Sequence, residues 1–160
     1  MIDASRAQRV SGAQPASRRW AVALLVGGGA LSALNGAAHL VLPLLYPWEQ
    51  HAEGLYEPVR WALFATTVFF AILLVLCGAL TVLVARASNL PPQVVTWVAA
   101  GMAIFWSVGA AYEVIIPFPA PVADWALPVF SVSVALLYLV GLRLWLRSQP
   151  DASSHRSTQG

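Results

Sequence analysis

Residues 59–85 read VRWALFATTVFFAILLVLCGALTVLVA, and this run decides the fold. Its only charged residue is Arg60, near its beginning. An α-helix rises about 1.5 Å per residue, so about 20 apolar residues span the roughly 30 Å hydrocarbon core of a bilayer. A backbone in lipid must satisfy its own hydrogen bonds, and a run of this length does so as a helix. The run therefore predicts a transmembrane helix.

Three further apolar runs of similar length surround it, at residues 20–46, 94–116 and 126–146. The chain of 160 residues is 59% hydrophobic and only 10% charged, which leaves too little polar surface for a soluble domain. We expect an all-α membrane protein in which residues 20–147 form one bundle of four transmembrane helices. The small polar segments 1–19 and 148–160 are predicted to be disordered tails.

The arginines predict the orientation of this bundle. Eight of the nine lie before the first run, between the second and third runs, or near and beyond the end of the fourth, and only Arg60 lies on the opposite side. Positive residues concentrate in cytoplasmic segments of membrane proteins. Both termini are therefore predicted to be cytoplasmic, in a multi-pass protein of the inner membrane.

Several kinds of chemistry have no motif in this chain. Cys77 is the only cysteine, so an intramolecular disulfide is excluded. The three consecutive glycines at 27–29 lie inside an apolar run, where they favour close helix packing rather than a phosphate-binding loop. The aromatic residues lie mostly in or beside the apolar runs, so no nucleic-acid partner is predicted.

Small and polar side chains recur at helical spacing in each apolar run. Residues three or four apart share one face of a helix, and polar groups in a membrane must find partners inside the bundle. We therefore expect two stripes to face the interior: Gly28, Ser32, Asn35, His39 and Tyr46; and Arg60, Phe64, Thr67, Ala71, Leu74, Gly78 and Thr81. In the third run Met102, Trp106, Gly109 and Glu113 share one stripe, and in the fourth Ser131 and Tyr138 lie seven residues apart on one face.

The ionisable members of these stripes define the candidate site. An ionisable residue inside a membrane segment costs about 2.5–3.5 kcal/mol, so its presence indicates a function or a partner. Helix rise places His39, Arg60 and Glu113 in the outer part of the membrane, where we expect a polar cluster. The predicted ligand-binding residues are Asn35, His39, Arg60, Trp106 and Glu113.

Three interpretations of this cluster remain open. In the first it is structural: Glu113 pairs with Arg60, and His39 bonds to Asn35 or to a backbone carbonyl. In the second it holds a metal or haem, because imidazole and carboxylate suit zinc, iron or copper. The residues that would supply the ligands are His39, His51, Glu53 and Glu113.

In the third interpretation, a small apolar molecule such as a quinone, isoprenoid or sterol enters from the bilayer. Such a pocket would support catalysis if Glu113 and His39 acted as acid and base. The function we predict is an accessory or lipophile-binding membrane protein, with membrane lipid and a membrane protein as partners. A membrane enzyme acting on a quinone or isoprenoid-like substrate, and a metal or haem carrier, are the alternatives. No motif specifies a cofactor.

One short pattern resembles a known family. It consists of Gly36-x-x-His39-Leu40-x-x-Pro43, then Trp48, then Arg60-Trp61. This pattern is similar to small four-helix bacterial membrane proteins of the DoxX-like kind, over the first three helices. Some of those relatives are described as membrane subunits of quinone-linked sulfur oxidation, so the resemblance implies a redox accessory role.

The four-helix layout with His39 and Glu113 is also similar to the emopamil-binding, sterol-isomerase-like family. That resemblance implies a sterol-like substrate. The run of acidic and aromatic positions that this family carries across several helices is not matched here.

Overall fold

The structure, a computed structural model, describes residues 16–45, 53–116 and 123–149. These residues form four helices: α2 (Ala16–Leu45), α4 (Glu57–Arg86), α5 (Pro92–Ile115) and α6 (Ala123–Arg147). All four are long and apolar enough to cross a membrane, which confirms the predicted helical architecture. The first helix begins at Ala16, so residues 16–19, which the sequence assigned to a disordered tail, are helical.

Prolines mark where two of these helices begin. Pro58 lies in the first turn of α4 and Pro92 opens α5. The first turn tolerates proline because the backbone N–H groups there have no partner within the helix. Pro128 instead lies inside α6, as the sixth residue of the helix, and the helix continues through it.

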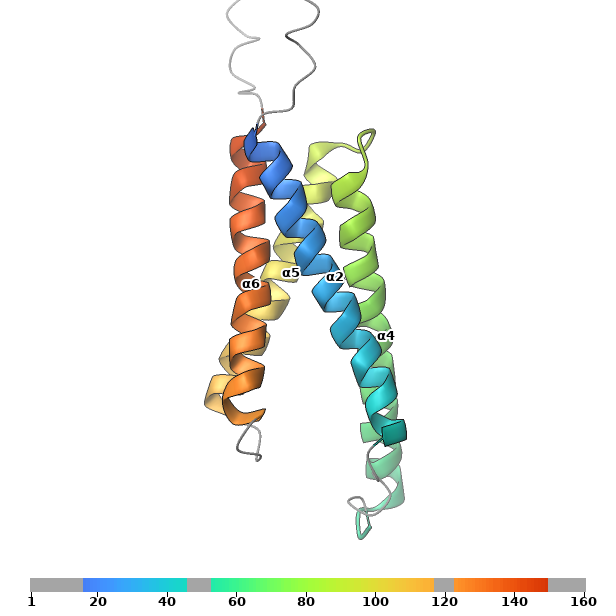
Figure 1. Cartoon of the computed structure of the whole chain (residues 1–160). Helices are drawn as coiled ribbons and strands as arrows, with labels where there is room; N and C mark the ends of the chain where they lie inside the picture. Colours follow the sequence, from blue (N-terminus) through green and yellow to red (C-terminus); the bar gives the residue numbers. More distant parts are fainter. Residues whose placement is uncertain (1–15, 46–52, 117–122, 150–160) are drawn as a thin grey trace, which may run out of the picture.

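Successive helices run in opposite directions, so Ala16 and Arg147 lie at the same end of the bundle as the connection between α4 and α5 (Figure 1). We call this end the turn end. The opposite end, where α2 and α5 finish and α4 and α6 begin, is called the loop end.

The four helices are arranged as two pairs. α2 packs along α4, and α5 packs along α6. α2 also packs on α6, because it starts beside α6 at the turn end and slants across to α4 at the loop end (Figure 1). α4 and α5 barely touch, although only a few residues join them. The two pairs are therefore held together mainly through α2.

Glycines allow the backbones of α2 and α4 to approach closely. A Cβ atom added at Gly78 would lie 2.5 Å from the backbone oxygen of Gly29, and one added at Gly36 would lie 2.7 Å from that of Ala71. Small residues at such contacts are typical of membrane helices, which associate by close van der Waals packing because lipid offers no hydrophobic driving force.

Glycines also allow close packing between α2 and α6, although there they face side chains rather than backbone. Gly28 lies against the ring of Tyr138, where an added Cβ would be 3.1 Å from a ring carbon. Gly141 lies against Leu25, with a corresponding distance of 3.0 Å. Tyr138 and Leu25 are both fully buried, so this contact forms part of the core of the bundle.

Trp145 of α6 contacts both α5 and α2 at the turn end. Its indole N–H donates to the backbone oxygen of Pro92 at 3.4 Å, which connects α6 to the start of α5. The Arg18 guanidinium lies 5.4 Å from the centre of the same ring, at a distance typical of a cation–π contact. This contact packs the first turn of α2 against α6.

We predict that Gly78→Ala destabilises the protein by about 1–3 kcal/mol, because the new methyl group must push α2 away from α4. Gly27→Ala is the matched control, since no atom lies within 4 Å of a Cβ added there. The control should be neutral or slightly stabilising, because alanine is the better helix former. Thermal unfolding in mild detergent measures both, and equal midpoints would refute the close α2–α4 contact.

Candidate functional site

A hydrogen-bonded group of buried side chains joins the helices at the middle of the bundle. The indole N–H of Trp106 on α5 donates to the Ser32 hydroxyl on α2 at 2.8 Å. Ser32 in turn donates to the backbone oxygen of Gly28 at 2.9 Å. The Tyr138 hydroxyl of α6 lies 3.2 Å from the same Ser32 oxygen. Because Ser32 uses its single proton on Gly28, Tyr138 is the donor in that contact.

The remaining helix, α4, contributes Thr81 to this group. The Tyr138 side chain interacts with Thr81 as well as with Ser32. Thr81 is buried, and its hydroxyl also donates to the backbone oxygen of Cys77 at 2.8 Å. Ser32 and Thr81 belong to the two stripes that the sequence predicts to be interior, and both are buried, whereas Phe64 of the second stripe is exposed. Trp106 and Tyr138 belong to the stripes noted in the third and fourth apolar runs. One residue from each helix therefore meets at this point.

The predicted ligand-binding residues do not lie together. Trp106 is buried and its N–H is used by Ser32. Asn35 and His39 are half-buried on α2, and neither side chain forms a hydrogen bond within the part of the chain that the structure describes. The predicted bond of His39 to Asn35 or to a carbonyl is therefore not formed there. The His39 ring instead lies edge-on to Phe70, with centroids 5.9 Å apart.

The predicted ion pair between Arg60 and Glu113 is wrong. The Arg60 guanidinium pairs with Glu57, one turn away on α4, and both side chains are exposed. Glu113 is half-buried on α5, and its Oε2 atom is buried without a hydrogen-bond partner among the described residues.

The divergence of α4 from α5 explains this error, because Arg60 and Glu113 lie at similar depths on two helices that barely touch. Phe70 of α4 contacts both His39 of α2 and Phe105 of α5, at centroid distances of 5.9 and 5.8 Å, so these three rings mark similar levels. At 1.5 Å per residue, Glu113 lies about 12 Å beyond Phe105, and Arg60 lies about 15 Å beyond Phe70, both toward the loop end. His39 is thus deeper in the bundle than the other two charged candidates.

The metal hypothesis stays a prediction. Within residues 16–45, 53–116 and 123–149 no three histidine, cysteine, aspartate or glutamate side chains lie close enough together to hold a metal ion. One of the four proposed ligands, His51, lies outside these residues, and Glu53 is exposed. The acid–base role of His39 and Glu113 also stays a prediction, and the two lie at different depths.

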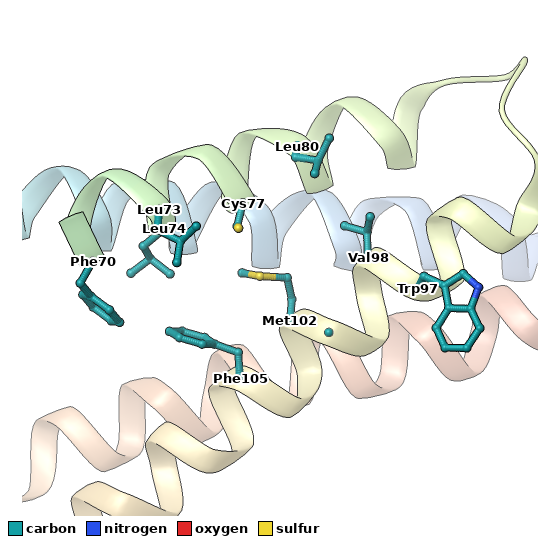
Figure 2. A pocket seen from close by; sticks show the side chains of 10 residues that line it. Phe70, Leu73, Leu74, Cys77, Leu80, Trp97, Val98, Met102 and Phe105 are labelled. Carbon is teal, nitrogen blue, oxygen red and sulfur yellow. The ribbon is translucent and has the colours of Figure 1, made fainter. Parts of the chain in front are cut away.

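A groove lies between α4 and α5 (Figure 2). It has a volume of about 340 Å³. Phe70 and Phe105 lie at one end and Trp97 at the other, with Cys77 and Met102 facing each other between them. Its walls are formed by Phe70, Leu73, Leu74, Cys77, Leu80, Trp97, Val98, Gly101, Met102 and Phe105.

The groove exists because its two helices separate soon after the turn that joins them. α4 is drawn toward α2 by the glycine contacts, whereas α5 packs on α6. Gly101 widens the groove further, since no atom lies within 4 Å of a Cβ added there. The polar groups in the walls are the Cys77 thiol and the indole N–H of Trp97, and neither is charged, so the groove suits a hydrocarbon rather than a charged molecule.

Comparison with known proteins adds no further assignment. No family model matches the chain, and no curated protein or solved structure matches it.

We predict that Ser32→Ala destabilises the protein by about 1–2 kcal/mol, because the buried N–H of Trp106 loses its acceptor. Ser133→Ala is the matched control, since Ser133 is exposed and bonds only the backbone oxygen of Val129. Trp106→Phe should cost less in a Ser32→Ala background than in the wild type. Denaturant titration in detergent would give the four free energies of unfolding, and strict additivity would contradict the shared bond.

Proposed function

We propose that the chain is a multi-pass inner-membrane protein that binds a lipophilic small molecule in the groove between α4 and α5. The observation that carries this proposal is the groove itself, which is apolar and lies between two membrane-spanning helices. Small-molecule sites are concave, mostly apolar, and range from about 300 to 1,000 Å³, so the groove is at the small end of that range.

The shape of the groove favours one slender hydrocarbon chain. Leu74 and Met102 are buried and form a fixed floor. Phe70 and Phe105 lie at one end, with exposed fractions of 37% and 36%, so part of each ring remains available to a ligand. An isoprenoid or acyl chain satisfies such walls without hydrogen bonds, whereas a polar molecule would lose its hydration there.

The accessory role that we propose follows from the same geometry. A protein that holds a lipophile in an open membrane groove can present it to a membrane protein partner. The resemblance to DoxX-like proteins supports this role, since some of those proteins are described as membrane subunits of larger systems.

Blocking the groove tests the proposal. We predict that wild-type protein in mild detergent binds one molecule of geranylgeraniol, and that Gly101→Leu loses this adduct because leucine fills the widest part of the groove. Gly27→Leu is the matched control. It also introduces a side chain where no atom lies within 4 Å, but on α2 and outside the groove. Native mass spectrometry counts the bound molecules.

Two outcomes would reject this site. If the wild type forms no stoichiometric adduct at micromolar probe, the groove is not a site for such a chain. If Gly101→Leu and Gly27→Leu bind equally well, the probe occupies another surface. Unfolding midpoints of the two variants, measured in parallel, show whether each remains folded.

The proposed orientation has its own test. In a Cys77→Ala background, a cysteine at Leu55 should react with a membrane-impermeant maleimide on intact cells, and one at Ser88 should not. Leu55 is exposed near the start of α4, and Ser88 is exposed in the turn that follows α4. Positive-inside placement of Arg86 puts that turn in the cytoplasm. Labelling at Ser88 alone would reverse the orientation.

A further inference from the structure

Glu113 is half-buried, and one of its carboxyl oxygens has no hydrogen-bond donor. This Oε2 atom is buried and has no partner among the described residues, and the one ion pair found there is between Arg60 and Glu57. Removing a carboxyl oxygen from water without a donor is costly. A donor from outside this chain would remove that cost.

A continuous line on α5 connects Glu113 to the groove. Gly101, Phe105, Gly109 and Glu113 follow one another at intervals of four residues, and such residues form one ridge along a helix. Gly101 and Phe105 line the groove. Gly109, like Gly101, has no atom within 4 Å of an added Cβ, so the line between Phe105 and Glu113 is not blocked at that position.

The distances along this line fit an elongated amphiphile. Glu113 lies eight residues beyond Phe105, which corresponds to about 12 Å along the axis of α5. A molecule with its chain in the groove can therefore pass Gly109 and place its end group at Glu113, nearer the loop end. The groove walls offer the Cys77 thiol and the indole N–H of Trp97, and neither is a strong hydrogen-bond acceptor like the Glu113 carboxyl group.

We propose that the ligand is an amphiphile whose head group donates a hydrogen bond to the Glu113 carboxyl group, while its hydrocarbon chain lies between α4 and α5. This inference rests on the proposed function and names the class of molecule. The unpartnered Oε2 oxygen is the acceptor in this bond, so the head group carries a hydroxyl or an amine. A quinone, whose carbonyl groups only accept, does not meet this requirement, whereas a prenol, a quinol or a sterol does.

The positions of the other charged side chains favour a ligand over an ion pair within the chain. Arg60, the one arginine near the loop end of α4, bonds Glu57 and lies on the helix that diverges from α5. Glu113 shares the interior stripe of Met102 and Trp106, both buried, so its carboxyl group belongs to the inward side of α5. A head group that follows the ridge reaches it from that side.

The test compares two probes that differ in one donor. Geranylgeraniol carries a terminal hydroxyl, and its methyl ether keeps the oxygen and the chain but has no donor. We expect wild-type protein to bind the alcohol about tenfold more tightly than the ether, because the ether cannot donate a hydrogen bond to Glu113. Competition measured by native mass spectrometry gives the ratio of the two dissociation constants directly.

Variants at Glu113 assign the preference to this residue. Glu113→Leu should weaken alcohol binding to the level of the ether and leave ether binding unchanged, which also shows that the variant is folded. Glu113→Gln keeps an acceptor oxygen and should retain part of the preference. Equal binding of both probes to the wild type, or an unchanged preference in Glu113→Leu, would overturn the inference while the groove stands. Binding of neither probe to the wild type would overturn the groove as well.

Discussion

The hydrogen bonds at Ser32 are the interaction on which the arrangement of this bundle depends. Helices in lipid gain no hydrophobic driving force from contact with one another, so packing and interhelical hydrogen bonds must hold them. Ser32 accepts from Trp106 and contacts Tyr138, so one small side chain on α2 joins both helices of the other pair. A larger residue would separate the helices, and an alanine would leave the indole N–H unpaired.

The diagonal course of α2 follows from these contacts and from its glycines. Gly28 and Ser32 hold its middle to α6, and Gly36 holds its later turns to α4. α4 is consequently bound to α2 and not to α5, its neighbour in sequence. The apolar groove is the space that this arrangement leaves. The features that stabilise the bundle thus also create the site where we propose that a lipophile binds.

Much of the fold could be predicted from the sequence because lipid imposes simple rules. Apolar length identified the four helices, and helical spacing placed Ser32 and Thr81 in the interior. Spacing within one helix carries no information on which helices pack against each other. This is why one interpretation paired Arg60 with Glu113, whereas α4 diverges from α5 and Arg60 bonds Glu57.

The groove could not be predicted for a related reason. Its walls are leucine, valine and phenylalanine, the same residues that cover the lipid-facing surfaces, so composition does not distinguish the two. These residues line a groove only because α4 diverges from α5. Gly101 alone does not predict the groove, because a glycine in a membrane helix indicates close packing as readily as an open space.

The most direct test of the central claim is to map where a lipophile lies. A diazirine-bearing analogue of geranylgeraniol, photolysed with the protein in native membranes and located by peptide mass spectrometry, would report the residues it touches. Our account predicts adducts concentrated on residues 70–80 of α4 and 97–105 of α5, the two segments that line the groove. Equal labelling of the exposed apolar face of α6, around Leu136 and Leu139, would show general solvation by lipid and contradict a specific site.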